Sequence, residues 1–543
     1  MKKIIAFLNT AYASWICILL ALSVRIIQVA FVSFIGRDKA MQLLMAKNYL
    51  EGNGFTITKY FIQNPDQPYF DPAPMWPPGY SFIMAILFRL FKSDYYLSVL
   101  VFETVVAALF IWSFRRLCKQ LRFPKHVVNL MTLVAGAFHY VCFIESYVTD
   151  GAALAFLLFA FTGCLSLLQR PEDFSKAMCI GIGVLLAVPA LLRYMYVPVV
   201  ILLPFYLINA GFSSKQKQLL QKALITGATT IILVFGMMLW IKYSSGRMGY
   251  IKETGSGIFP GNFLYWHPAL LSSFFNTNFA GMQISKLTHI RLQDVARVFE
   301  ILGMVLSAAV IALLVLRRKK VSAQLKQPVL SHFFKAGILL TLAIYIVLIT
   351  LTLTNKPQEM ANGNWNYIYG ARYYAFVHVF VQLCFVALLV HTAAWKKILF
   401  YKVTAWLLIL VLSFETLHGI YFSAKVALHF TDLKSKRSQE HDYRFFVNFV
   451  KQLKQENPRK KIIAASTDEF FMSMAVLMGE KGVYDPYELN IQLPQVREEC
   501  ILIAAINEKQ TEEFRSFLSQ PDIKYLSTQS GVSFYMQKLP AVQ

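Results

Sequence analysis

The sequence predicts a polytopic α-helical membrane protein with a small C-terminal α/β domain. Of its 543 residues, 56% are hydrophobic and only 15% are charged, and the mean hydropathy is +0.49. One soluble core cannot bury this much apolar surface. The apolar residues also form runs of about 20, the length at which an α-helix crosses a hydrocarbon layer of about 30 Å with its backbone groups paired internally.

About eleven such runs follow one another within residues 1–422, which we assign to a transmembrane domain. The first run continues from Val24 through Val32, past the apolar core of a cleaved signal peptide, so we expect it to remain as an anchor. The expected spans are 12–34, 95–114, 126–144, 150–168, 177–192, 195–209, 219–241, 298–316, 334–353, 373–392 and 398–422.

The basic residues responsible for the net charge of +23 lie in alternate loops. The positive-inside rule places these loops in the cytoplasm. We therefore expect a plasma membrane protein, in bacteria of the inner membrane, with a cytoplasmic N-terminus and an extracytoplasmic C-terminal domain. Residues 423–543 carry nearly balanced charge, so no basic stripe is left to bind nucleic acid. The basic clusters fall at 2–3, 115–125, 215–222, 317–320 and 396–402.

The loops expected on the outer side are long, which places the chemistry there. The first, residues 35–94, begins with apolar residues at helical spacing that predict an amphipathic helix on the membrane surface. The stretch at 69–82, YFDPAPMWPPGYSF, predicts an extended connector stiffened by prolines. It leads into a short helix after Pro78, a position where proline is tolerated in a first helical turn.

Residues 423–543 alternate between helical and strand patterns, which predicts a small α/β domain. Cys500 is the only cysteine of this tail, so no disulfide framework supports the domain. Helices are expected at 440–456, from Asp468 and at 511–519, and strands at 461–466, 500–506, 523–528 and 533–538.

Ionisable side chains near span ends are costly to bury, which makes them functional candidates. Asp38 is either a catalytic carboxylate or a helix N-terminal residue favoured by the macrodipole. Asp150 and Glu145 share one short outer turn, where they can bind a metal, orient a hydroxyl or cap a helix. Arg193 and Arg372 either grip a lipid phosphate or serve as snorkelling anchors.

Three further residues are candidates for substrate contact. Asp71, before Pro72, is either a substrate contact or, as we favour, a turn former. Tyr80 belongs to the PPGY connector, close to Asp71 in the same outer loop. His267 lies in the aromatic stretch GNFLYWHPALL, which either lines a sugar site or forms an interfacial belt. No histidine or cysteine spacing predicts a metal cluster.

The order of these features resembles the GT-C superfamily of polyprenyl-phosphate-sugar-dependent glycosyltransferases. That superfamily includes the protein O-mannosyltransferases and the aminoarabinose transferases of lipid A. The resemblance covers most of the membrane half, and no single segment is diagnostic. The segments are, in order, GRDKAMQLLMAKNYLEGNGF, PPGYSF with a short helix ending LFRLF, VTDGAALAFLLFAF, LLRYMYVPVVILLP and ARYYAFVHVF.

The resemblance implies a cell-envelope enzyme that transfers a sugar, with inversion, from polyprenyl phosphate such as undecaprenyl phosphate. The acceptor is a hydroxyl of a protein, glycan or lipid on the extracytoplasmic face. In this scheme Asp38 is the general base, Asp150 the second acid and Arg372 the contact to the donor phosphate.

Two departures from the family pattern qualify these roles. Trp76 stands where the aminoarabinose transferases carry a lysine before the paired prolines, so phosphate binding falls to Arg372, Arg193 or Arg37. Lys39 follows Asp38 where the family often has glutamate, which weakens a metal role for this position. No cofactor is certain, and a divalent metal is compatible with the scheme.

The alternative, from a different functional class, is a membrane transporter or lipid flippase with an external domain. Transporters typically show broken helices at corresponding positions of two repeats. Gly181, Gly183 and Pro189 interrupt one span, but no partner segment mirrors them.

Overall fold

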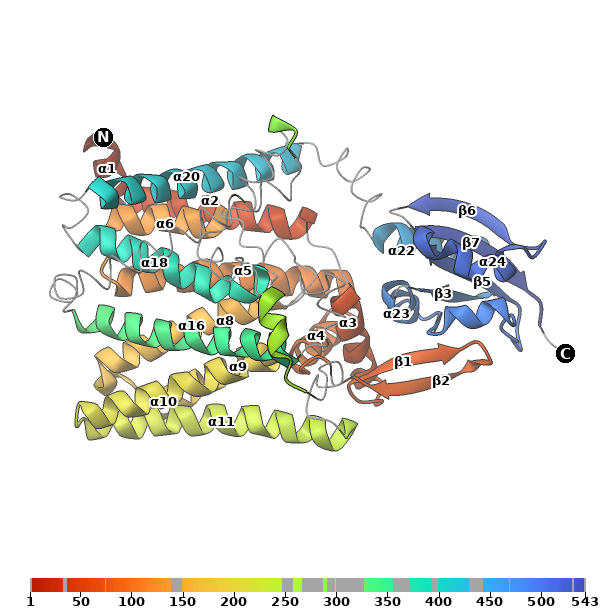
Figure 1. Cartoon of the computed structure of the whole chain (residues 1–543), viewed down its shortest axis with the longest axis horizontal. Helices are drawn as coiled ribbons and strands as arrows, with labels where there is room; N and C mark the ends of the chain where they lie inside the picture. The colour runs from red at the N-terminus through yellow and green to blue at the C-terminus, as the bar shows by residue number, and fades with distance from the viewer. Residues whose placement is uncertain are drawn as a thin grey trace. The chain divides into compact units, whose positions relative to one another are not determined.

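The chain divides into two compact units in the computed structural model (Figure 1). The first unit comprises residues 1–30, 102–145 and 149–425, and the second comprises residues 31–101, 146–148 and 426–543. The structure describes residues 2–32, 37–73, 75–137, 149–246, 257–265, 287–290, 298, 327–354, 371–391, 399–428, 443–467, 469–529 and 532–541.

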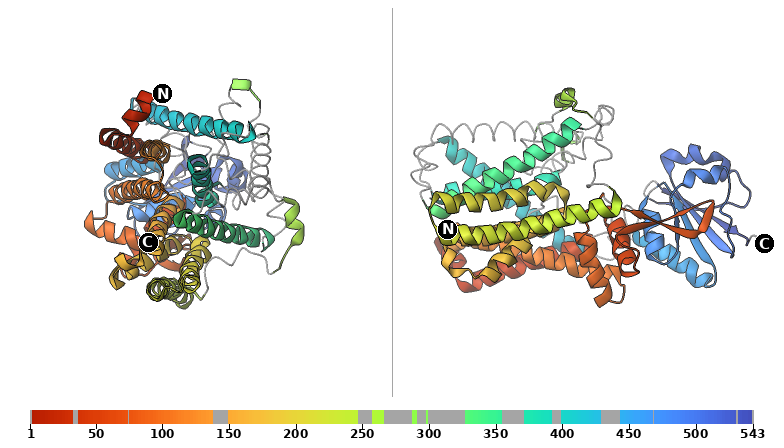
Figure 2. Two further views of the ribbon diagram at one scale, coloured as in Figure 1. Left: turned by 90° about the vertical axis from the view of Figure 1, so that its left-hand side faces the viewer. Right: turned by 90° about the horizontal axis from the view of Figure 1, so that it is seen from below.

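The first unit is helical throughout its described part. Its long helices run roughly alongside one another in the views of Figures 1 and 2. They are α2 (Ala11–Val32), α5 (Tyr95–Gln120), α6 (Lys125–Ala137), α8 (Asp150–Gln169), α9 (Lys176–Leu192), α10 (Val197–Ser213), α11 (Lys217–Ser245), α16 (Pro328–Thr354), α18 (Ala375–His391) and α20 (Leu399–Leu428). Short elements are α1 (Lys2–Leu8), η1 (Pro171–Asp173), η2 (Tyr194–Tyr196), η3 (Pro260–Tyr265) and η5 (Ala371–Tyr374).

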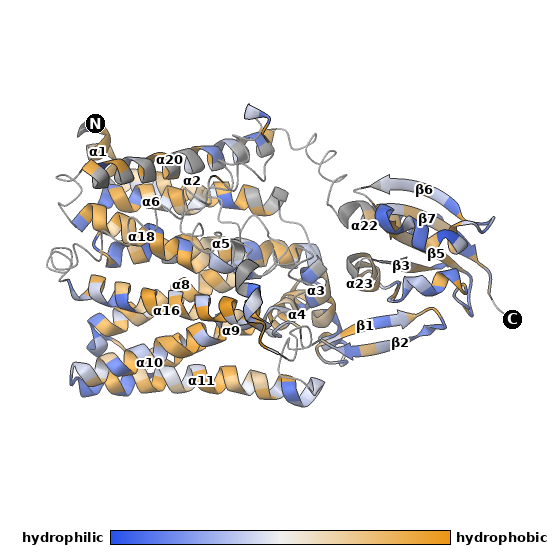
Figure 3. Ribbon diagram, in the orientation of Figure 1, coloured by the Kyte–Doolittle hydropathy of each residue, from blue (hydrophilic) through white to orange (hydrophobic). Residues whose placement is uncertain are grey.

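Among the described helices, five are long and apolar enough to cross a membrane: α5, α8, α10 with η2, α11 and α16. Apolar residues colour most of their length in Figure 3. The plan is therefore that of a helical membrane protein, as predicted. The expected span at 298–316 lies almost wholly outside the described residues, and the total of about eleven stays a prediction.

Small residues bring the helices of the first unit into close contact. A methyl group added to Gly183 of α9 would lie 2.6 Å from the backbone oxygen of Thr226 in α11. In α11, the Thr230 hydroxyl donates a hydrogen bond of 3.0 Å to the Gly183 carbonyl. Small residues and threonine hydroxyls are the usual means of packing helices within a membrane.

The second unit combines a sheet with helices from two distant parts of the chain. The strands are β1 (Thr56–Phe61), β2 (Asn64–Pro72), β3 (Lys461–Ser466), β4 (Lys481–Val483), β5 (Cys500–Asn507), β6 (Lys524–Gln529) and β7 (Val532–Leu539). The helices are α3 (Arg37–Leu50), α4 (Gly79–Leu90), α22 (Tyr443–Glu456), α23 (Glu469–Leu477) and α24 (Arg515–Leu518), with η6 (Pro486–Asn490) and η7 (Glu508–Phe514).

The seven strands lie in the order β2-β1-β4-β3-β5-β7-β6. Strands β1, β4, β3 and β5 are parallel, whereas β2 pairs antiparallel with β1, and β7 pairs antiparallel with both β5 and β6. Strand β5 is buried along seven of its eight residues, which explains its continuous apolar sequence. Strand β2 contains three prolines and occupies the edge, where a missing N–H is tolerated.

The first outer loop packs with the tail in this unit. Lys481 of β4 forms an ion pair with Asp66 of β2. The Lys47 ammonium of α3 donates to the Val476 carbonyl of α23 at 2.6 Å, and burial lowers the pKa of that ammonium. The unit that contains the tail therefore also contains residues 31–101, which include the first outer loop that we expected at 35–94 as part of the membrane domain.

One expectation for the first loop is wrong. Residues 39–46 of α3 are all buried, so α3 is a packed helix without the exposed face of an amphipathic one. It contacts α4, α23 and β1. Residues 69–72, the start of the expected connector, are extended as part of β2, and α4 begins at Gly79, directly after Pro78 as predicted; the β1–β2 hairpin itself was not predicted. The expected elements of the tail are found, although 511–519 is largely 3-10 helix, and the three-residue strand β4 was not predicted.

Candidate functional site

Two candidate residues of the first unit, Asp150 and Arg193, form a buried ion pair. The Arg193 Nε donates to one carboxylate oxygen of Asp150 at 3.1 Å, and a terminal nitrogen donates to the other at 2.6 Å. The Asp150 side chain is 0% exposed and that of Arg193 is 13% exposed. This bidentate geometry neutralises the carboxylate and fixes both side chains.

Local sequence explains why the two side chains meet. Asp150 is the first residue of α8, where a negative charge is favoured by the helix macrodipole. Arg193 lies in extended backbone between α9 and η2, and Pro198 follows at the start of α10, a position that suits proline. Thr149 donates through its hydroxyl to the Leu192 carbonyl at 3.2 Å. This bond satisfies one of the backbone groups left open at the end of α9.

Asp71 lies in β2 of the second unit and is not in a turn, so the turn-forming role that we favoured is wrong. Its carboxylate forms an ion pair with Lys59 of the neighbouring strand β1, and its side chain is 37% exposed. Residues on adjacent strands are close enough to pair in this way. The strand was not predicted because a segment with three prolines lacks the usual strand pattern.

Asp38 occupies the first turn of α3 and is half-buried. Its backbone carbonyl accepts a hydrogen bond of 3.2 Å from the Gln42 side chain. Within the described part of the chain, its carboxylate has neither an ion-pair nor a hydrogen-bond partner. Asp38 thus differs from Asp71 and Asp150, whose charges are compensated by lysine and arginine.

The remaining candidates are placed only in part. Tyr80 lies in the first turn of α4 and is fully buried. The backbones of Arg37 and Arg372 are described, in α3 and η5, but their side chains are not. Glu145 and His267 lie outside the described residues.

No group of three or more His, Cys, Asp or Glu side chains comes together in the described ranges. Asp150, the second acid of the expected scheme, has both oxygens occupied by Arg193.

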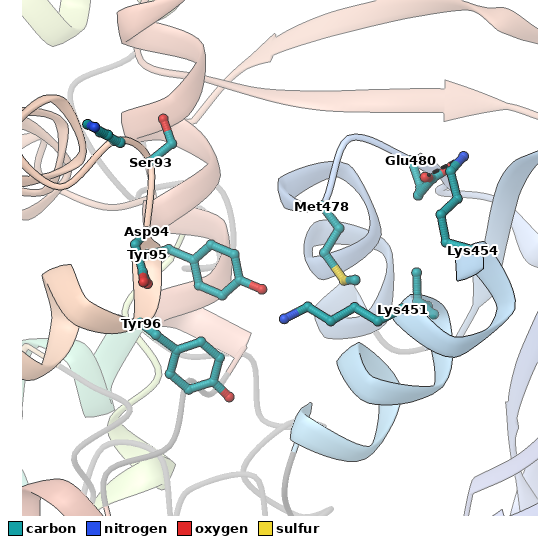
Figure 4. Close-up of a pocket in the computed structure, with 10 residues that line it drawn as sticks. Ser93, Asp94, Tyr95, Tyr96, Lys451, Lys454, Met478 and Glu480 are labelled. Carbon is teal, nitrogen blue, oxygen red and sulfur yellow. Dashed lines mark ion pairs between the residues drawn. The ribbon is translucent and has the colours of Figure 1, made fainter. Parts of the chain in front are cut away.

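A pocket of about 490 Å³ in the second unit is lined by residues that no sequence pattern singled out. It lies between the residues before and at the start of α5 and the end of α23 with α22 (Figure 4). Its lining mixes lysines and tyrosines at no recognisable spacing, so no sequence signal pointed to it.

The chain is similar in fold to several solved structures. ArnT from Cupriavidus metallidurans bound to undecaprenyl phosphate has a TM-score of 0.48 and 11% identity, with 96% of this chain and 97% of that one covered. The Archaeoglobus fulgidus oligosaccharyltransferase in complex with Zn and sulfate has a TM-score of 0.45 and 11% identity, with 96% and 72% covered. AglB from Archaeoglobus fulgidus with an inhibitory peptide and a dolichol-phosphate has a TM-score of 0.43 and 12% identity, with 93% and 70% covered.

No protein-family model and no curated protein matches the sequence. The three TM-scores are all below 0.5, which leaves the function to be argued from the residues of this chain.

Proposed function

We propose that the chain is an integral membrane glycosyltransferase with Asp38 as its general base. We assign the base by asking which of the candidate carboxylates has an ion-pair or hydrogen-bond partner. Asp71 and Asp150 are held in ion pairs, whereas Asp38 has no partner among the described residues. A carboxylate must keep its lone pairs available to accept a proton, and only Asp38 of these three meets that requirement.

The proposed reaction transfers a sugar from a polyprenyl phosphate, such as undecaprenyl phosphate, to an acceptor hydroxyl. The hydroxyl oxygen attacks the anomeric carbon, Asp38 takes the hydroxyl proton, and the bond from that carbon to the phosphate oxygen breaks. The lipid phosphate leaves with the bonding electrons. Attack from the face opposite the phosphate inverts the anomeric centre.

The arginines divide into two proposed roles. Arg193 is engaged by Asp150, so we assign this pair to holding the start of α8 against the junction of α9 and α10. Arg372 and Arg37 are then the proposed contacts to the donor phosphate, where a guanidinium stabilises the charge that develops as the phosphate leaves. Tyr80, Glu145 and His267 stay proposed substrate contacts.

The proposal also includes the arrangement of the chain in the membrane. We infer about eleven spans, a cytoplasmic N-terminus and an extracytoplasmic second unit, in the plasma membrane or the bacterial inner membrane. A donor with an isoprenoid tail has to be reached from within the bilayer, which is consistent with apolar helices α5, α8, α10, α11 and α16. The acceptor is a protein, a glycan or a lipid.

The test uses full-length protein in nanodiscs with an undecaprenyl-phosphate-linked radiolabelled sugar and a membrane extract as the source of acceptor. Release of free undecaprenyl phosphate and label transfer are both measured. We expect Asp38→Asn to lower turnover about 10²- to 10⁴-fold, the usual contribution of a positioned base. The matched control is Asp522→Asn, which changes an exposed carboxylate of the same unit that has no proposed role in the reaction.

Full turnover by a folded Asp38→Asn protein would remove Asp38 from the mechanism. Recovery of the lipid-linked sugar intact, on the opposite leaflet and without free lipid phosphate, would instead indicate a flippase.

A further inference from the structure

Helix α4 of the second unit is apolar on its exposed face as well as on its buried face. The Ser81 hydroxyl on the buried face lies 3.8 Å from the Met45 sulfur of α3. The other buried residues of α4 are Tyr80, Met84, Ala85 and Phe88. The opposite face presents side chains four residues apart in the sequence, namely Phe82 at 47%, Ile86 at 48% and Leu90 at 67% exposed.

Helix α22 of the same unit shows what a helix with one face in water looks like. Its buried residues are apolar, namely Phe446, Val450 and Leu453. Its exposed residues are all polar, namely Asn448, Lys451, Gln452, Gln455 and Glu456. The exposed face of α4 has the opposite composition, and Arg89 is the only charged residue of that helix. A helix that is apolar all round is typical of a protein interior or of contact with lipid.

The end of α3 extends this exposed apolar face. The Tyr49 ring packs edge-on against the Phe82 ring, with centroids 6.2 Å apart, and stacks on the Phe55 ring at 4.4 Å. Tyr49 is itself exposed. We call Tyr49, Phe82, Ile86 and Leu90 the α4 patch. Contiguous exposed apolar side chains of this kind mark a surface that contacts a partner or a membrane.

The chain connection places the end of α4 at the boundary of the membrane. Helix α5, one of the described helices that are long and apolar enough to cross a membrane, begins at Tyr95, five residues after Leu90. Five residues reach at most about 18 Å, and the turn is closed by a hydrogen bond of 2.7 Å from the Ser93 N–H to the Phe88 carbonyl. Tyrosine, as at Tyr95 and Tyr96, is typical of the membrane–water interface. The last turn of α4 therefore lies close to the point where α5 enters the bilayer.

The length of α4 excludes a second crossing of the membrane by this helix. Its 12 residues extend for about 18 Å at a rise of about 1.5 Å per residue, whereas the hydrocarbon core is about 30 Å thick. A short helix with an apolar face instead lies at the boundary between head groups and acyl chains, with that face turned into the lipid.

We propose that the α4 patch is a membrane-contact surface, covered by the acyl chains of the leaflet that α5 enters at Tyr95. The second unit is then bound to the bilayer through a surface of its own, in addition to its chain connections to the first unit. Helix α3 contacts α4 and meets the buried face of α4 at Ser81. The contact with lipid therefore also fixes how far α3 lies from the bilayer. This surface does not depend on the proposed glycosyl transfer.

The experiment places the polarity-sensitive dye NBD on single exposed positions of the full-length protein in phosphatidylcholine nanodiscs. The patch variants are Ile86→Cys and, one turn later on the same face, Leu90→Cys. The matched control is Ile491→Cys, an exposed isoleucine just beyond η6 in the same unit. Native cysteines of the described chain are buried or half-buried, and their background labelling is measured on the wild type. Each dye is then quenched with doxyl groups on the lipid acyl chains or with iodide in the water.

We expect doxyl lipid to quench the dye in both patch variants, iodide to leave it bright, and its emission to shift to the blue. The dye in Ile491→Cys should show the reverse. Quenching of the patch variants by iodide as strong as that of the control would place the patch in water and overturn the proposal.

Two other results also overturn it. Protection of the patch from both quenchers means that protein covers it, either a second copy of the chain or another partner. Equal quenching of the Ile86→Cys and Ile491→Cys dyes by doxyl lipid means that the contact is not specific to α4. None of these results bears on the role of Asp38, which is measured separately by turnover.

Discussion

Removal of Arg193 tests how strongly the first unit depends on its buried ion pair. In Arg193→Gln the Asp150 carboxylate, which is 0% exposed, would lose both of its hydrogen bonds from the guanidinium. Two unit charges about 4 Å apart attract by about 4 kcal/mol at an effective dielectric constant of about 20. Stranding a buried charge by removing its partner costs about 3–5 kcal/mol in proteins. We therefore expect a loss of about 3–5 kcal/mol in the free energy of unfolding.

Changing Asp150 and changing Arg193 should lower the free energy of unfolding by different amounts. The Arg193 side chain is long and 13% exposed. It can therefore reach water when Asp150 is changed, whereas Asp150 cannot move out of α8. Asp150→Asn should accordingly cost less than Arg193→Gln. The double variant should be more stable than Arg193→Gln alone because no buried charge is then left unpaired.

The assay is equilibrium unfolding of the purified protein in mixed micelles with SDS, followed by helical circular dichroism. Lys217→Gln, which removes an exposed cation at the start of α11, serves as the control for charge loss in the same unit. A loss of less than about 1 kcal/mol in Arg193→Gln, or simple addition of the two single effects in the double variant, would refute the expected dependence on the pair.

Two further predictions concern the second unit. A methyl group added in Gly482→Ala would lie 2.5 Å from the Met472 carbonyl oxygen. We therefore expect overpacking to lower the free energy of unfolding by about 1–3 kcal/mol and to speed hydrogen exchange in β3 and β4. The control is Gly181→Ala, whose added methyl group meets nothing within 4 Å. The hydrogen bond from Lys481 holds the pKa of Asp66 below its ordinary value of 3.8. The ion pair therefore stabilises the second unit at pH values above 3.8, and this stabilisation is lost as the pH falls through the lowered pKa of Asp66. Asp66→Asn should therefore destabilise the unit near neutral pH, with the difference from wild type shrinking in acid; a constant difference at all pH values would contradict this.

The elements that the sequence predicted correctly are those with a strong local signal. Helices such as α8, α9 and α11 follow from apolar length, and β3 and β5 follow from short apolar runs between turns. The candidate carboxylates were also recognised from the local sequence, because an acidic residue at the start of a helix beside an apolar run is a pattern of neighbouring residues. What those residues do not reveal is which carboxylate is neutralised.

The folded chain settles that question through contacts between residues far apart in sequence. Arg193 reaches Asp150 across 43 residues, and Lys481 reaches Asp66 across 415. The β1–β2 hairpin joins the sheet of the tail, although β2 contains three prolines and β4 has only three residues. The length and period of the apolar runs predicted the helices, because that signal is local. Ion pairs and strand pairing depend on partners that no local pattern contains, so only the folded chain showed that Asp71 and Asp150 are paired and that the Asp38 carboxylate has no partner among the described residues.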